Sequence, residues 1–137
     1  MEKEFVPYEL AVKLKALGFG EPCFGYYYTL NDKDWKFAER ADYFRLDDEI
    51  SIGGKFSLLA PTFSQAFRWF RENKLADGSV CRHGKADGSY SYRWDIVYEY
   101  GVYEERHFKQ DYKTYEEAEL ACLEKLIEIV DKTKQYV

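Results

Sequence analysis

The stretch that decides the fold is residues 89–137, SYSYRWDIVYEYGVYEERHFKQDYKTYEEAELACLEKLIEIVDKTKQYV. Its first part places an aromatic or aliphatic residue at every second position, and successive side chains of a strand point to opposite faces. One face would carry Tyr90, Tyr92, Trp94, Ile96, Tyr98 and Tyr100. The other face is mostly polar, with Val97 as its large apolar member. This pattern predicts a half-buried antiparallel strand.

A second strand and a helix follow. The break near Gly101 predicts a hairpin that returns over residues 102–108. Thr114 then begins a helix, because Glu117 three residues later completes a capping-box pattern. The apolar positions of this helix cover a broad arc, which indicates that it lies across the sheet. Glu119 falls inside the arc, where we expect the helix dipole or a position beyond the sheet edge to accommodate it.

Earlier segments add two helices and several short strands. Residues 7–17 predict a helix that ends at Gly18, and residues 61–73 predict one capped by Thr62 with Gln65. Strands are expected at residues 23–30, 42–46, 55–59 and 80–82, with turns at 47–49 and 53–54. The expected fold is α+β, a single globular domain over residues 1–137. Its antiparallel sheet would have roughly four to six strands, with the C-terminal helix packed across it and two further helices.

Composition excludes several classes of protein. The 137 residues carry a net charge of −5, which counts against a general nucleic-acid binder, because phosphate neutralisation needs basic residues. Three cysteines at wide spacing, without a CxxC pair, are untypical of a secreted disulfide framework. The charged start and the lack of a long apolar run predict neither a leader nor a membrane span. We therefore expect a cytoplasmic protein with reduced thiols and no membrane partner.

The aromatic strand face has two interpretations. It matches, in residue type, the stacking platforms of single-stranded nucleic-acid binders, and Arg82, Lys85 and Arg93 lie close to it in sequence. The preferred interpretation is that this face is the core under the C-terminal helix, because so apolar a helix must cover something.

A basic stretch stands out within the acidic chain. Residues 61–93 hold six basic and three acidic residues, the basic ones being Arg68, Arg71, Lys74, Arg82, Lys85 and Arg93. They could form one patch for an acidic partner or a nucleotide phosphate, although a solvated helix face is the simpler interpretation. Trp69 lies roughly 100° from the middle of the stripe formed by Phe63, Ala66, Phe67 and Phe70. We therefore expect it to be half exposed and able to anchor a contact.

Catalysis and metal binding find no positive support in the sequence. Cys81 and His83 are two residues apart, which is not zinc-finger spacing, and His107 has no sequence partner. Cys81, His107 and Asp95 could approach one another in space as nucleophile, base and orienting carboxylate, but no motif requires it. Cys122 falls within the apolar arc and is expected to be an inert core residue. We expect no cofactor and no metal, and lean against an enzyme.

Three parts of the chain together resemble a known group. They are EFVPYEL at 4–10 with LGFGEPC at 17–23, APTF at 60–63 with FRWFR at 67–71, and YEEAE at 115–119 with LEKLI at 123–127. They resemble small uncharacterised proteins encoded by phages and mobile elements of gut Bacteroidales. The resemblance implies an accessory protein acting in a bacterial cytoplasm, and it brings no known activity or site residue.

The leading hypothesis is a non-catalytic interaction protein that modulates a host protein or defence system. Its contact residues would be Trp69 and exposed tyrosines among residues 26–28, with Tyr27 as the representative. The alternative is a small binding module for a nucleotide or a short single strand, which would use Arg68, Arg71, Arg82 and Arg93. An unpaired edge near residues 103–108 would favour self-association, and its charges would oppose it, so we expect a monomer or weak homodimer.

Overall fold

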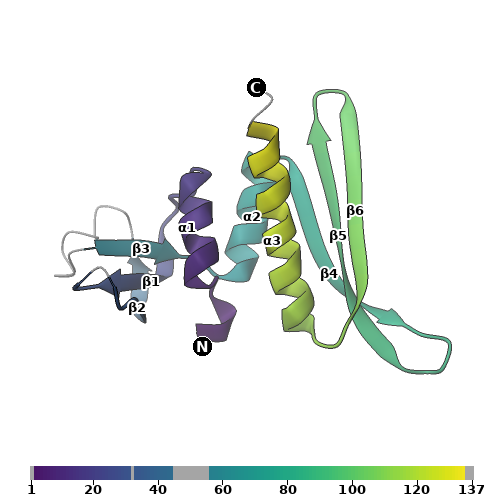
Figure 1. The fold of residues 1–137 in the computed structure, drawn as a ribbon, viewed down its shortest axis with the longest axis horizontal. Helices are drawn as coiled ribbons and strands as arrows, with labels where there is room; N and C mark the ends of the chain where they lie inside the picture. Colours follow the sequence, from purple (N-terminus) through teal and green to yellow (C-terminus); the bar gives the residue numbers. More distant parts are fainter. Residues whose placement is uncertain (1, 32, 45–55, 135–137) are drawn as a thin grey trace. The chain divides into compact units, whose positions relative to one another are not determined.

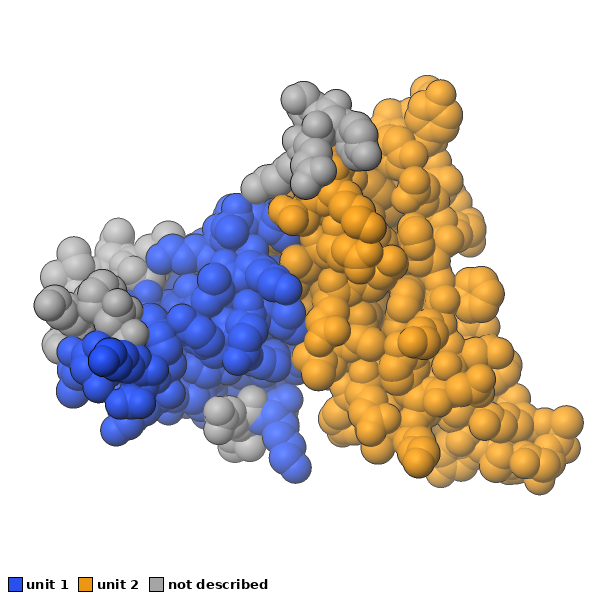
Figure 2. Space-filling model, in the orientation of Figure 1, with its two compact units in different colours: residues 1–66 blue, residues 67–137 orange. Residues whose placement is uncertain are grey.

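A computed structural model describes residues 2–31, 33–44 and 56–134 of the chain. It confirms the α+β class, with three α-helices and six strands among the described residues. The strands form two antiparallel three-stranded sheets instead of the one sheet expected from the sequence. Two compact units, residues 1–66 and 67–137, divide the chain within a helix (Figure 2). The single domain over 1–137 stays a prediction.

The first unit holds a short 3₁₀ turn, one helix and the first sheet (Figure 1). Its elements are η1 (Glu2–Glu4), α1 (Tyr8–Ala16), β1 (Cys23–Thr29), β2 (Lys36–Phe44), β3 (Phe56–Ala60) and the start of α2 (Phe63–Asn73). The strand order is β2-β1-β3. The predicted strand at 42–46 covers only the end of β2, and the predicted turns at 47–49 and 53–54 lie outside the described residues.

Helix α1 ends as its sequence predicts. Gly18 has a φ of 105°, a left-handed conformation that glycine adopts without a steric penalty. Its N–H donates to the Lys15 carbonyl at 3.0 Å, and the Phe19 N–H donates to the Leu14 carbonyl at 3.0 Å. These two bonds make a Schellman motif. The ring of Phe19 is buried, so the turn also contributes to the core.

Tyr27 lies in the core. The expectation that it is an exposed contact residue is therefore wrong. Strand β1 is central in its sheet, and alternate residues from Cys23 to Thr29 are buried. The Tyr27 hydroxyl donates a hydrogen bond of 2.8 Å to the Val6 carbonyl, which satisfies its polar end away from water. Tyr26 and Tyr28 point to the other face and are half buried.

Helix α2 confirms its cap and corrects its buried face. The Thr62 hydroxyl accepts a hydrogen bond from the Gln65 N–H at 3.2 Å. Gln65 does not close the capping box, and its amide donates to the Pro22 carbonyl at 2.9 Å. Trp69 is 5% exposed and Phe67 is intermediate, so the half-exposed Trp69 expected above is wrong. The buried face of the helix is formed by Phe63, Ala66, Trp69 and Phe70. Trp69 thus takes the place that the sequence pattern assigned to Phe67.

The second unit is a three-stranded meander with a helix on one face. After the end of α2 come β4 (Ala76–Gly84), β5 (Tyr90–Tyr100), β6 (Tyr103–Tyr112) and α3 (Tyr115–Lys134). The sheet order β4-β5-β6 follows the chain (Figure 1). Helix α3 packs on β4 and β5 and touches β6 much less. The strand predicted at 80–82 lies within the longer strand β4. The hairpin predicted around Gly101 is confirmed as β5 and β6.

The aromatic face of β5 is core along its middle. Trp94, Ile96 and Tyr98 are buried on the side that α3 covers. Tyr90 and Tyr100, at the two ends of the strand, are exposed. Gly78 of β4 allows α3 to approach closely, because a Cβ there would lie 2.9 Å from Leu126 Cδ1. The core interpretation of this face is thus correct for the middle of the strand.

Helix α3 begins as predicted. The Thr114 hydroxyl accepts a hydrogen bond of 3.1 Å from the Glu117 N–H. Glu119 is half buried, and its partial burial raises the pKa of its carboxyl, with Glu116 adding to the shift. Among the described residues, no helix has the length and apolar character needed to cross a membrane.

Candidate functional site

The predicted basic residues do not share one surface. Arg93 pairs across the ladder with Cys81, and Arg82 pairs with Tyr92. Because adjacent positions of a strand point to opposite faces, Arg82 and Arg93 lie on opposite faces of the second sheet. Arg68 and Arg71 are exposed on α2. The sheet therefore divides the expected patch.

Most of these cations already have partners nearby. Arg71 lies 3.9 Å from Asp77, and Lys85 lies 3.6 Å from Asp111. Three further contacts involve Arg93 with Asp95, Arg82 over the Tyr90 ring at 4.9 Å, and Lys74 over the Trp69 ring at 5.4 Å. The hydrogen bond to Asp95 is the main reason that the pKa of Arg93 is raised. The carboxylates beside Arg71, Lys85 and Arg93 reduce the positive charge that these three residues offer to a phosphate.

Two expected contact residues are not accessible. Trp69 packs edge-on against Phe70, with ring centroids 5.1 Å apart, and Tyr27 is buried as described. Neither can reach a partner without local unfolding.

The Cys–His–Asp arrangement does not form. His107 pairs with Ile96, which faces α3, whereas Cys81 pairs with Arg93 on the other face of the sheet. The sheet therefore separates the Cys81 thiol from the His107 ring. Across the described parts of the chain, no three His, Cys, Asp or Glu side chains gather closely enough to hold a metal ion.

The three thiols differ in exposure. Burial is the main cause that raises the pKa of both Cys23 and Cys122 to about 12, whereas Cys81 is exposed. We expect a thiol reagent such as iodoacetamide at mildly alkaline pH to label one cysteine per native chain. Peptide mapping should place the label at Cys81, and Cys81→Ser should abolish fast labelling. Labelling of all three at equal rates in native protein would contradict this packing.

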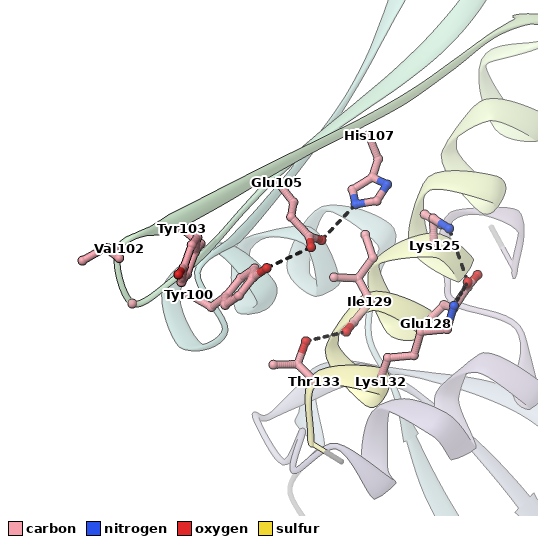
Figure 3. A pocket seen from close by; sticks show the side chains of 11 residues that line it. Tyr100, Val102, Tyr103, Glu105, His107, Lys125, Glu128, Ile129, Lys132 and Thr133 are labelled. Atoms are coloured by element: carbon pink, nitrogen blue, oxygen red, sulfur yellow. Dashed lines mark hydrogen bonds and ion pairs between the residues drawn. The ribbon is translucent and has the colours of Figure 1, made fainter. Parts of the chain in front are cut away.

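A groove lies between α3 and the β5–β6 hairpin (Figure 3), and sequence reasoning missed it. It has a volume of about 850 Å³ and is formed entirely by residues of the second unit. The lining residues are Tyr100, Gly101, Val102, Tyr103, Glu105, His107, Lys125, Glu128, Ile129, Lys132 and Thr133. The groove exists because α3 covers β4 and β5 and leaves the helix-side face of β6 largely open.

The hairpin tip supplies the apolar rim of the groove. Gly101 has a φ of 60°, which suits the first central position of a two-residue type II′ turn. Val102 beside it is 94% exposed, and Tyr103 is 66% exposed. Tyr98, Tyr100 and Tyr103 stack in succession, with ring centroids 5.4 Å and 5.7 Å apart. These ring contacts form an apolar surface at the tip, called the tyrosine ledge below.

Glu105 organises the β6 wall. Its carboxylate accepts a hydrogen bond from the Tyr100 hydroxyl at 3.0 Å and lies 3.3 Å from His107 Nε2 (Figure 3). The contact with His107 is the main cause that lowers the pKa of Glu105, and the Tyr100 bond adds to it. The hydrogen bond between Tyr100 and Glu105 is also the main cause that raises the pKa of Tyr100. The β6 wall of the groove therefore carries the Glu105 carboxylate, which contacts Tyr100 and His107.

The α3 wall is similarly paired. Lys132 Nζ lies 2.9 Å from Glu128 Oε1, and Lys125 Nζ lies 3.3 Å from the same oxygen. The Lys132 bond is the main cause that lowers the pKa of Glu128. Ile129 lines the groove between these charges and the hairpin. The groove thus combines apolar surface with two lysines that share Glu128 on α3 and with Glu105 on β6.

A second hollow of about 680 Å³ continues along the same helix and strand. It shares His107, Lys125 and Glu128 with the first and reaches Tyr112. Tyr112 accepts a hydrogen bond of 3.0 Å from the Trp94 indole N–H. The two hollows therefore adjoin each other along α3 and β6.

Comparisons with protein-family models, with curated proteins and with solved structures found no match.

Proposed function

We propose that the chain is a non-catalytic protein-binding module whose groove between α3 and the β5–β6 hairpin receives an apolar segment of a partner. The observation that carries this is the exposure of Val102 and Tyr103 directly beside a groove of about 850 Å³. Exposed apolar side chains that rim a hollow are typical of interaction sites.

The charges of the groove favour a protein over a phosphate ligand. Lys125 and Lys132 both contact Glu128, and Glu105 contacts Tyr100 and His107. A nucleotide would have to compete with Glu128 for both lysines. An apolar or aromatic side chain would leave these pairs intact and would bury the tyrosine ledge.

The biological context follows from the resemblance noted in the sequence. We propose that the partner is a host or phage protein, that the chain acts in a bacterial cytoplasm, and that binding modulates a host protein or defence system. The alternative is a module for a nucleotide or short single strand, in which bases would stack on the tyrosine ledge. This alternative predicts binding that weakens as the salt concentration rises.

A peptide-display library of random 12-residue sequences, panned on purified protein, tests the proposal. We expect enriched peptides to carry aromatic or aliphatic residues, and Tyr103→Asp to weaken their binding by about tenfold or more, as for an interface anchor. The matched control is Tyr90→Asp, because Tyr90 is similarly exposed at the opposite end of β5. Isothermal titration calorimetry would measure each affinity.

Two outcomes would count against a protein-binding groove. Equal loss of peptide affinity in the Tyr90 and Tyr103 variants would remove the groove from the proposal. Tight binding of labelled oligo(dT) that weakens steeply with salt, together with no peptide enrichment, would favour the nucleic-acid alternative.

A further inference from the structure

Strand β6 is an edge of the second sheet. Within the described residues it pairs with β5 and with no other strand. It is ten residues long and contains no proline, and its pairing with β5 is regular from Tyr103 to Lys109, with a bulge between Lys109 and Tyr112. A long unpaired edge exposes a row of backbone N–H and C=O groups that can pair with another strand. Helix α3 packs mainly on β4 and β5 and touches β6 much less.

Symmetry restricts how β6 could pair with a copy of itself. An antiparallel strand pair with two-fold symmetry has its axis perpendicular to the sheet, so helix-side residues face helix-side residues. Tyr103, Glu105, His107 and Lys109 alternate on the helix side, with Glu105 and His107 lining the groove there. Each allowed register is therefore centred on one residue that faces its own copy.

Charge selects one of these registers. Centring on His107 places Glu105 opposite Lys109 twice, once on each side of the axis. On the other face the same register places Arg106 opposite Phe108, a cation–aromatic pair. Phe108 already accepts such a contact, from Arg93 at 5.2 Å.

The neighbouring registers bring like charges together. Centring on Glu105 opposes two carboxylates, centring on Arg106 opposes two guanidinium groups, and centring on Lys109 opposes two ammonium groups. Within the regular segment, centring on Phe108 places His107 opposite Lys109 and joins no unlike charges. Among registers that pair most of the regular segment, the one centred on His107 alone joins unlike charges without opposing two carboxylates, two guanidinium groups or two ammonium groups.

We propose that β6 pairs antiparallel with β6 of a second copy of this chain, centred on His107, to form a continuous six-stranded sheet. Lys109 supports this occupant, because it contacts the Tyr112 ring at 5.7 Å and has no ion-pair partner among the described residues. Glu105 retains acceptor capacity beyond its bonds to Tyr100 and His107. The inference does not depend on the groove's partner.

Charge exchange between two variants gives a direct test. In Glu105→Lys the lysines at 105 and 109 would face each other, and in Lys109→Glu the two carboxylates would. We expect each variant to dimerise about 10- to 50-fold more weakly than wild type, since two pairs turn from attractive to repulsive. Mixed together, the two variants should form a heterodimer, because both cross-strand pairs regain unlike charges. The double variant should recover wild-type association.

Sedimentation velocity from about 1 μM to 1 mM would measure these equilibria. Glu104→Lys is the matched control, because Glu104 lies outside the regularly paired Glu105–Lys109 segment in this register and the same change should alter association less than about threefold. A wild-type chain that stays monomeric over the whole range would overturn the proposal. So would a dimer that Glu105→Lys leaves unchanged, or single variants that fail to associate when mixed.

A covalent readout checks the register itself. His107→Cys, made in a Cys81→Ser background, places two thiols opposite each other at the axis, where cross-strand geometry allows a disulfide. We expect an oxidised dimer for this variant and much less for Arg106→Cys in the same background. Equal crosslinking at both positions would contradict the register.

Discussion

Replacing Trp69 with alanine is expected to lower the free energy of unfolding by about 3–5 kcal/mol, the range for a buried aromatic residue. The Trp69 side chain is 5% exposed, it packs edge-on against Phe70, and Lys74 lies over its ring. Its removal therefore leaves a cavity on the buried face of α2. Urea unfolding followed by far-ultraviolet circular dichroism would measure the change.

Val102→Ala is the control for this substitution. Its side chain is 94% exposed, so we expect a stability change within about 0.5 kcal/mol. A Trp69→Ala protein that unfolds at the wild-type urea concentration would contradict the core assignment. Such a result would restore Trp69 as a candidate contact residue.

Leu126→Ala should destabilise the second unit by about 2–5 kcal/mol. Leu126 is fully buried on the face of α3 that packs against β4. Its Cδ1 would lie 2.9 Å from a Cβ placed on Gly78, so the helix and strand are in close contact at this point. Thermal and urea unfolding of the variant would measure the loss.

Gly78→Ala tests the same contact from the strand. In wild type the added methyl would also approach Cys122 Sγ to 3.0 Å, which forces the core to shift. In the Leu126→Ala background the methyl can occupy vacated space. We expect the loss of unfolding free energy in the double variant to be about 1 kcal/mol smaller than the sum of the losses in the two single variants. Strict additivity would show that the two positions are not in contact.

Local signals in the sequence predicted the elements well. Thr62 and Thr114 cap helices as their spacing indicated, and Gly18 ends α1 in the left-handed conformation. These features depend on neighbours a few residues away, so the sequence pattern contains them. The alternation of β5 likewise identified Trp94 and Ile96 as core.

Long-range pairing was harder to predict. Alternation shows that a segment is a strand but not which strand it joins, so the division into two sheets did not follow from the pattern. Trp69 was misplaced because the direction of the buried face depends on what packs against the helix. For Tyr27, three successive tyrosines hid the register, and the central position of β1 decided it.

The groove shows the same limit. Glu105 and His107 could be assigned to one face of a strand from spacing alone. How far α3 covers that face is a matter of packing between elements, which no local pattern encodes. The residues of the candidate site were therefore partly foreseeable, whereas the hollow between them was not.

The order of strands in the two sheets has a consequence for chain entropy. In the second sheet, five residues separate β4 from β5 and two separate β5 from β6, whereas 26 residues separate β1 from β3 in the first. Loop-closure entropy grows with the logarithm of loop length, so a flexible connection of 26 residues costs about 1.5 kcal/mol more to close than one of five. The topology thus favours early formation of the C-terminal meander, whose strands are joined by short connections.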